Sequence, residues 1–314
     1  MENVQLVLHD EEQLRVSLNS AEKGQNLYDA AKIVLRGDGY ATQEDAARDG
    51  GRWRDVVSRA FALMHLAADF SDQDPSGVSV SIGQVVFSEH LRRHLMADFP
   101  GITVFEDQSG LLLATAGELS GCVRPSSEKC RSVLFQAERL HEPLKDSERL
   151  AFDLYSGSFF QPSADARLLM LTMAIETLLD LQPRSDAAHV HVAAMIEATE
   201  ANVSLAQAER DSIRGTLNWL YKESIGQAGR ALARTLEPRT YDSRKPAAFF
   251  TRCYDVRSAL THGHVPRPDY REVNSLAGSL ELFVGDLLAG RLLHATPDDV
   301  EVGGLVARDG SDCP

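Results

Sequence analysis

Hydrophobic and polar positions follow different periods in the two halves of the chain. In residues 1–140, short alternating runs such as Val4–Leu8 and Leu14–Leu18 are separated by polar turns, and a period of two is typical of strands with one buried face. After about residue 141, apolar residues recur every three or four positions without any alternating run. The pattern predicts an α+β protein, with a mixed α/β domain at 1–140 followed by an all-α helical bundle at 141–297.

Local signals in the first half predict individual elements. The polar stretch His9–Gln13 predicts a turn that joins the first two runs into a hairpin. Tyr28–Leu35 is expected to form a helix, because two glycines follow it. A second helix start is expected at Thr42–Asp45, which is close to a capping box, and Arg54–Ala68 repeats apolar residues at helical spacing.

Further strands are expected later in this half. Val78–Ile82 alternates as a strand does, and Ile102–Phe105 with Leu111–Leu113 forms a predicted strand pair. The polar, proline-containing segment Cys122–Cys130 predicts a loop before the helical half. These patterns indicate no specific function. The domain at 1–140 is interpreted in general terms, as a sensor or specificity module.

The second half is expected to be helical throughout. Arg167–Leu181 is apolar almost all round, which is typical of a central bundle helix. A polar, glycine-rich tail at 298–314 is expected to be frayed. The remaining predicted helices are Asp146–Leu154, Ala187–Glu200, Ala206–Lys222, Ser224–Leu236, Pro246–His262 and Tyr270–Leu293.

Composition excludes several classes of protein. The first ten residues are acidic and mixed, unlike a secretory signal, and the longest apolar stretches are too short to span a bilayer. The 4 cysteines form no CxxC pair and suggest no disulfide framework. We therefore expect a cytoplasmic protein with reduced thiols and no membrane partner.

The charge is unevenly distributed. The formal net charge of -14 argues against a general nucleic-acid coat, because clustered Lys and Arg drive phosphate binding. However, residues 210–271 contain 12 basic and 6 acidic residues, an excess of six positive charges. This basic stretch suggests a local site for an anionic substrate on an otherwise acidic protein.

Most familiar catalytic motifs are missing from the sequence. The chain has no dinucleotide fingerprint, Walker loop, GxSxG elbow or HExxH motif. His90 and His94 are spaced as metal ligands on one helical face, but two arginines lie between them and no third ligand suggests itself, so a solvated basic face is the preferred interpretation. His189 and His191 are two positions apart and face different ways on a helix. We therefore expect no metal and no cofactor.

The segment Phe250–Gly263 differs from the other candidates because it contains an arginine and a histidine at a familiar spacing. Arg257, four intervening residues and His262 fit the R-x4–6-H signature of the HEPN superfamily, and their neighbours resemble its Apea-like branch. The resemblance covers about residues 140 to 295 and excludes the first half. The residues that extend it are Tyr254, Ser258 and Gly263, with the earlier segments Asp146–Ala151, Ala166–Leu179 and Lys222–Ile225.

Helix geometry indicates how this pair could act. Gly263 suits the position just beyond a helix end and Pro266 prevents continuation, so His262 lies in the last turn, where the helix dipole favours an imidazolium. Arg257 is five residues earlier, which is about 140° round the helix and about 7.5 Å along it. One helix therefore does not place the two groups side by side. A two-fold axis would bring two Arg and two His around one cleft.

The resemblance implies a homodimeric, metal-independent endoribonuclease. In such enzymes a histidine assists attack by the RNA 2′-hydroxyl on the adjacent phosphorus, which leaves a 2′,3′-cyclic phosphate and a 5′-hydroxyl. Arg257 would hold the phosphate, Ser258 would orient a group, and His264 would add a phosphate contact. Lys222 would contribute to the basic surface, but from the sequence alone a merely solvated lysine is the preferred interpretation. The expected class is a prokaryotic defence or toxin-type effector.

Other interpretations stay open. Arg257 could form an ordinary salt bridge near Asp255 or cap a carbonyl, and some HEPN domains are non-catalytic modules that bind nucleotide, RNA or protein. Glu176 is interpreted as structural, pairing with a buried cation. An antitoxin or activating ligand is a further expected partner. One branch pairs with an antitoxin that modifies a tyrosine two residues after the histidine, but His264 occupies that position here and argues against such regulation.

Overall fold

The chain folds into two compact units. The computed structural model describes residues 5–11, 14–21, 24–27, 30, 33–68, 95–97, 112–114 and 127–295. The first unit comprises the described residues of Met1–Leu144 together with those of Leu288–Pro314, and the second is Lys145–Leu287. The helical region predicted at 141–297 therefore contributes its last turns, from Leu288 onwards, to the first unit. The predicted tail at 298–314 lies outside the described residues.

The first unit contains a three-stranded antiparallel sheet in the order β1-β2-β3. β1 (Gln5–Glu11) and β2 (Leu14–Ser20) form the predicted hairpin, which is confirmed. β3 (Ile33–Asp38) pairs with β2, so the helix predicted at Tyr28–Leu35 is wrong over its last three residues. The run Ile33-Val34-Leu35 fits either structure locally, and pairing with β2 decides between them.

Two short strands form a second, parallel pair. β4 (Leu95–Ala97) lies beside β5 (Leu112–Ala114), which overlaps the strand predicted at Leu111–Leu113. The strands predicted at Val78–Ile82 and Ile102–Phe105 lie outside the described residues. The loop predicted at Cys122–Cys130 is wrong from Ser127, where helix α4 begins; its earlier residues are also outside the described part.

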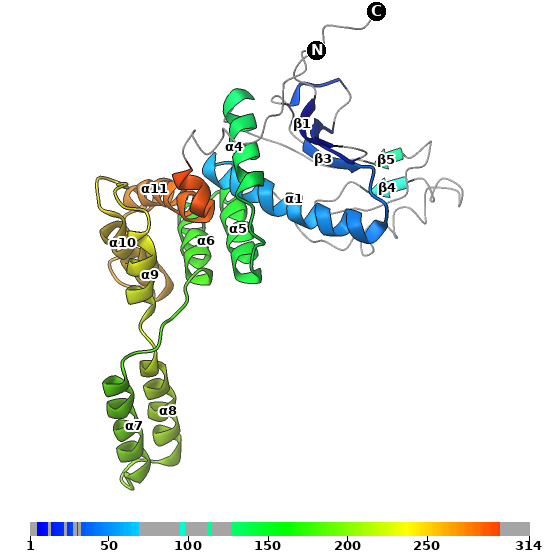
Figure 1. Cartoon of the computed structure of the whole chain (residues 1–314). Coiled ribbons are helices and arrows are strands. Elements are labelled where there is room, and N and C mark those ends of the chain that lie inside the picture. Colours follow the sequence, from blue (N-terminus) through cyan, green and yellow to red (C-terminus); the bar gives the residue numbers. More distant parts are fainter. Residues whose placement is uncertain are drawn as a thin grey trace, which may run out of the picture. The chain divides into compact units, whose positions relative to one another are not determined.

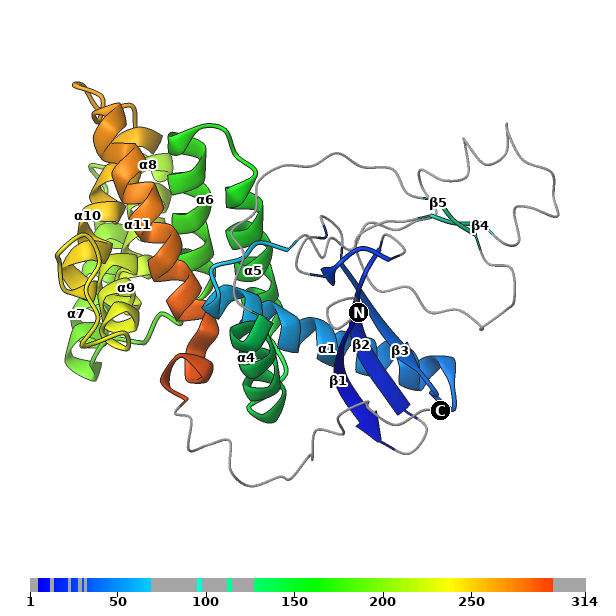
Figure 2. The same cartoon turned by 90° about the horizontal axis from the view of Figure 1, so that it is seen from above.

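Helix α1 packs into the first unit's core together with the sheet and helix α4. α1 (Gln43–Leu63) starts where the capping signal predicted, since the Thr42 hydroxyl accepts a hydrogen bond from the Asp45 backbone N–H at 3.0 Å. It is one continuous helix and lies behind the sheet in Figure 2. α4 (Ser127–Arg139) and η3 (Gly290–His294) also belong to this unit. The core residues shared by these elements include Leu6, Leu8, Val16, Leu18, Trp53, Val56, Ala60, Leu134, Ala137 and Leu292.

The second unit is helical, as the periodicity predicted (Figure 1). Predicted and observed helix ends differ by a few residues, because the predicted Ala206–Lys222 ends at Asn218 and the predicted Tyr270–Leu293 ends at Ala289. α6 packs against α5, α9 and α10. The helices are α5 (Asp146–Phe159), α6 (Ala164–Thr177), α7 (Asp186–Ala201), α8 (Gln207–Asn218), α9 (Ile225–Arg234), α10 (Pro246–Thr261) and α11 (Tyr270–Ala289).

Aromatic rings hold α10 in the main body of this unit, which we define as α5, α6, α9, α10 and α11. Phe249 of α10 lies between Tyr241 and Phe283, with ring centroids 5.6 and 5.5 Å away, and all three rings are buried. Phe250 packs so closely on Gly229 of α9 that a Cβ at Gly229 would lie 2.0 Å from the ring. The glycine therefore permits the close approach of α9 and α10.

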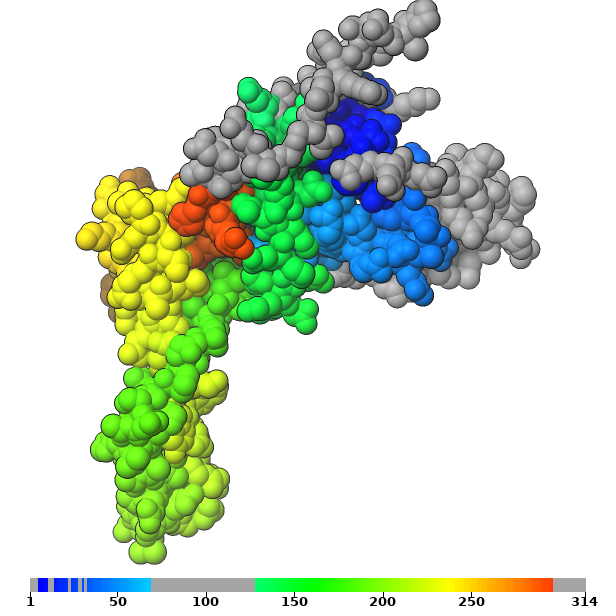
Figure 3. All heavy atoms as spheres, viewed as in Figure 1, coloured from blue at the N-terminus to red at the C-terminus, as the bar shows by residue number. Residues whose placement is uncertain are grey.

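α7 and α8 form a separate helical hairpin within the second unit (Figures 1 and 3). A neck of two paired segments, 182–184 and 221–223, joins it to the body. The Arg184 backbone N–H donates to the Tyr221 carbonyl at 2.9 Å, and the Glu223 N–H donates to the Gln182 carbonyl at 2.9 Å. Of the hairpin's two helices, α7 buries only Val192 and α8 buries no residue.

Candidate functional site

The C-terminal end of α10 carries the predicted histidine. α10 (Pro246–Thr261) ends with His262 as its cap, and Gly263 follows with a φ of +62°. The His264 backbone N–H then donates to the Ala259 carbonyl at 3.0 Å. This hydrogen bond and the left-handed glycine make up a Schellman closure. The helix end predicted from Gly263 is therefore confirmed, and its last turn presents His262 at the helix terminus.

Arg257 is held between a carboxylate and an aromatic ring. Its Nη2 atom lies 3.0 Å from Oε1 and 3.1 Å from Oε2 of Glu176 in α6. The guanidinium also lies over the ring of Tyr254, 5.6 Å from its centroid, and Tyr254 in turn stacks on Phe250 at 5.7 Å. The expectation that Glu176 pairs with a cation is confirmed. The partner of Arg257 is this distant glutamate and not a residue near Asp255.

The two motif residues have different neighbours within one chain. His262 and His264 are both exposed, and their rings stack with centroids 6.2 Å apart. Arg257 is about three-quarters buried beside Glu176, with side-chain exposures of 24% and 22%. Among the described residues, no hydrogen bond or ion pair joins Arg257 to His262, and the two side chains have different partners.

The other predicted site residues lie in two places. Ser258 is half-buried on α10, and its carbonyl accepts the His262 backbone N–H at 3.0 Å, so its backbone helps to close the helix. Lys222 is exposed in the neck, where its carbonyl accepts a hydrogen bond from Nε of Arg184 at 3.0 Å. The described hydrogen bonds of Lys222 therefore lie in the neck, and none of them involves Arg257.

The basic stretch 210–271 is largely neutralised by ion pairs. Its excess of six positive charges counts only acids inside the stretch. Five carboxylates from elsewhere in the second unit pair with its arginines, which reduces the excess to one. The pairs are Arg214–Glu200, Arg239–Asp286, Arg252–Glu272, Arg257–Glu176 and Arg267–Asp165. The basic surface expected from the sequence is therefore weaker in the folded chain.

A buried polar cluster supports the start of α10. Asp286 of α11 is 3% exposed and accepts a hydrogen bond from the Tyr241 hydroxyl at 2.5 Å, while Arg239 lies 3.2 Å away. Burial, and then the hydrogen bond to Asp286, raises the pKa of Tyr241 well above its usual range. Tyr241 therefore keeps its proton and acts as a donor, which ties the loop before α10 to α11.

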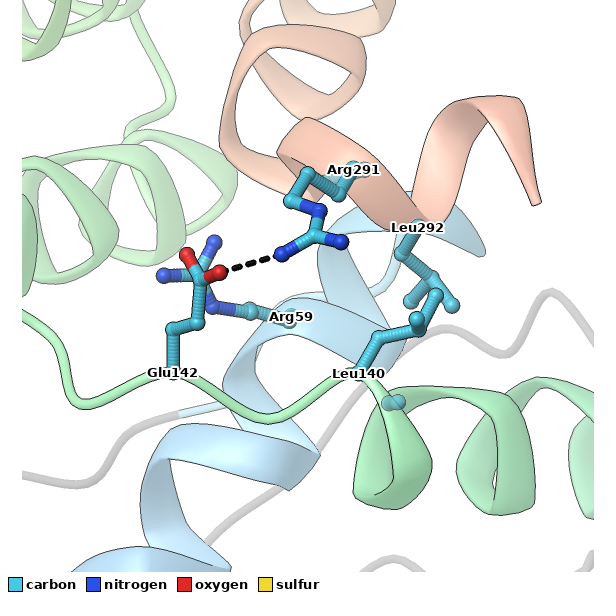
Figure 4. A pocket seen from close by; sticks show the side chains of 7 residues that line it. Arg59, Leu140, Glu142, Arg291 and Leu292 are labelled. Carbon is cyan, nitrogen blue, oxygen red and sulfur yellow. Dashed lines mark hydrogen bonds and ion pairs between the residues drawn. The ribbon is translucent and has the colours of Figure 1, made fainter.

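A small pocket in the first unit contains charged side chains but none of the predicted site residues (Figure 4). Arg59, Glu142 and Arg291 line this pocket, and Arg291 forms an ion pair with the Glu142 carboxylate. Leu140 and Leu292 form an apolar wall. No signal in the sequence predicts this cluster, because its members are far apart along the chain.

The structure shows no metal-ligand cluster in the part of the chain that it describes. The spaced pair His90 and His94 lies outside the described residues. His189 contacts the Tyr221 carbonyl at 2.9 Å whereas His191 is exposed, so these two residues do face different ways. Burial raises the pKa of the free Cys253 thiol to about 12, which makes it a poor nucleophile.

Comparison with known proteins identifies no relative. No family model, no curated protein and no solved structure matches this chain. Among the described residues, no helix has both the length and the apolar character needed to cross a membrane. The geometry of the site and the sequence motif are therefore the basis for assigning a function.

Proposed function

We propose that this chain is a metal-independent endoribonuclease of the HEPN type, in which Arg257 and His262 of two protomers form a composite site. In this proposal the protein acts in the cytoplasm as a homodimer and serves as a prokaryotic defence or toxin-type effector. The observation that carries this proposal is the exposed His262 on the Schellman-closed end of α10, on the same helix as an anchored Arg257.

The arrangement suits phosphate chemistry. The exposed imidazole of His262 can act as a general acid or base, which is the proton transfer that cleavage of a phosphodiester needs. Arg257 uses only Nη2 in its ion pair with Glu176, so among the described residues Nε and Nη1 make no hydrogen bond. These two donors are available to an incoming phosphate, which then competes with Glu176 for the guanidinium. His264 stacks beside His262 and offers a second contact for an anion.

The proposed reaction needs only protein groups. One imidazole accepts the proton of the RNA 2′-hydroxyl while the oxygen of that hydroxyl attacks the adjacent phosphorus. The phosphorus–O5′ bond breaks, and a protonated imidazole donates a proton to the departing O5′. Arg257 stabilises the negative charge that grows on the phosphate oxygens. The products are a 2′,3′-cyclic phosphate and a 5′-hydroxyl.

Single substitutions test the two roles. We expect His262→Ala and Arg257→Gln each to reduce RNA cleavage at least about 100-fold, the usual scale for losing an acid–base group or a charge-stabilising donor. Circular dichroism should stay unchanged, because His262 is exposed. His191→Ala removes a similarly exposed histidine from α7 and should cleave like the wild type. Cleavage should also survive EDTA.

Two results would contradict the proposal. If chelation abolishes cleavage and a divalent metal restores it, the metal-independent mechanism is wrong. A wild-type protein that binds several classes of RNA but cuts none would favour the non-catalytic binding module. The dimer is tested separately: mixing His262→Ala with Arg257→Gln protein should restore part of the cleavage if each protomer supplies a different group to a shared site.

A further inference from the structure

We infer that Glu176 is an internal counterion that occupies Arg257 until an RNA phosphate displaces it. This inference rests on the proposed anion-binding role of Arg257. It goes further because it states how the site is regulated: the unoccupied site is closed electrostatically by a carboxylate of the same chain, and substrate must compete with that carboxylate.

The contact geometry supports this role. Both Glu176 oxygens lie within 3.1 Å of the same atom, Nη2 of Arg257. The contact is therefore not the two-nitrogen, two-oxygen fork of the strongest Arg–carboxylate pairs, and it leaves the guanidinium free to rotate toward another anion. The Tyr254 ring would keep the guanidinium near the helix surface during the exchange.

The position of Glu176 in its helix also supports exchange. Glu176 is the penultimate residue of α6 (Ala164–Thr177). A carboxylate at a helix C-terminus is disfavoured by the helix dipole, so α6 itself does not stabilise the charge there. Arg257 is the cation that does so, and at about one-quarter exposure the pair is reachable from solvent.

Arg252 provides a matched control on the same helix. It pairs with Glu272 of α11, and both side chains are more exposed, at 40% and 39%. Arg252 precedes Arg257 by five residues, so it points about 140° away round α10. Glu272→Gln therefore changes the net charge as Glu176→Gln does, without releasing Arg257.

The test measures binding of a 2′-O-methyl RNA oligonucleotide, which cannot be cleaved, at several salt concentrations. Glu176→Gln should tighten binding about threefold at low salt, the usual scale of a partly exposed ion pair. The slope of log affinity against log salt should become steeper by about 0.7. In the wild type, the Glu176 carboxylate uncovered by RNA takes up a counterion that offsets the one released by the phosphate, and Glu176→Gln removes this offset. Glu272→Gln should leave the slope unchanged.

In an Arg257→Gln background, Glu176→Gln should have no effect on binding. Glu176→Asp, which keeps the charge on a shorter arm, should lie between the wild type and Glu176→Gln.

The outcomes separate this inference from the proposed nuclease. Unchanged or weaker binding by Glu176→Gln overturns the inference, as does tighter binding that persists without Arg257. If the wild type cleaves RNA but Glu176→Gln binds as before, only the inference fails. If Glu176→Gln tightens binding only when Arg257 is present, but unmodified RNA is never cut, only the proposed nuclease activity is contradicted. If no variant binds the oligonucleotide, both fail.

Discussion

The body of the second unit and its α7–α8 hairpin differ sharply in packing. In the body, Phe249, Phe250 and Phe283 are at most 1% exposed and contact neighbouring helices. In the hairpin helices, α7 buries only Val192 and α8 buries nothing. The candidate site residues Arg257 and His262 belong to the body. The proposed chemistry is therefore built on the well-packed helices, whereas the hairpin is connected only through its neck.

The contrast is not a difference in composition. α7 consists mostly of alanine, valine and other apolar residues, yet Val190 is 72% exposed. Apolar content alone therefore does not say which helix lies in a core. What differs is where the neighbouring helices lie: α10 packs against α6 and α9 of the body and contacts α11 through Phe249 and Phe283, while α7 packs mainly against α8 and η2 (Trp219–Tyr221).

The largest expected effect is loss of the central ring of the body. Phe249→Ala removes a fully buried side chain between two other rings, and we expect it to lower the free energy of unfolding by about 3–5 kcal/mol. Denaturant unfolding followed by circular dichroism measures this. Val190→Ala in the hairpin is the control and should change the free energy by less than about 0.5 kcal/mol. Similar losses for both variants would contradict the contrast.

A smaller effect is expected from the buried polar cluster. Asp286→Ala leaves the buried Tyr241 hydroxyl without its acceptor, which should cost about 2 kcal/mol of stability. Asp286→Asn keeps an acceptor of similar shape and should lose less. Thermal unfolding of the two variants compares them, and equal losses would show that the carboxylate's charge, rather than the hydrogen bond, stabilises this loop.

The N-caps of one body helix and one hairpin helix offer a matched pair. The Ser224 side chain caps α9, and the Ser185 side chain caps α7. Ser224→Ala should lower the stability of the body by about 1 kcal/mol. Ser185→Ala should instead increase amide hydrogen exchange in α7 and leave exchange in α10 unchanged, because the two helices are not packed together. Faster exchange in α10 after Ser185→Ala would show that hairpin and body unfold as one.

The smallest effect on the body is expected from removing the hairpin. The paired neck brings the chain segments on either side together, so residues 186–219 can be replaced by two glycines. Hydrogen exchange in α10 should change by no more than about 0.5 kcal/mol in local stability, and RNA cleavage should persist. If cleavage is lost while α10 stays protected, the hairpin has a role in substrate binding.

Local signals predicted the elements that position the site. Pro246 starts α10, Gly263 ends it, and the spacing from Arg257 to His262 follows from one helix between them. The error at Ile33–Leu35 has the opposite cause. A three-residue apolar run is compatible with helix or strand, and only pairing with β2 makes it a strand.

The charge of the site could not be predicted in the same way. Within residues 210–271 the sequence shows an excess of basic residues, but their partners include Asp165, Glu176 and Glu200, which lie earlier in the chain. Opposite charges interact over a few ångströms, and folding alone decides which residues come that close. A count along the sequence therefore overestimates the positive surface.

The sequence by itself determined where α10 begins and ends and that His262 would occupy its last turn, because capping and glycine conformation act within a few residues. Only the tertiary structure decided that Arg257 meets Glu176, 81 residues away, and rests over Tyr254. It also decided that α10 is packed in a body while α7 is exposed. Those outcomes depend on which helix faces meet, and that is a property of the whole folded unit.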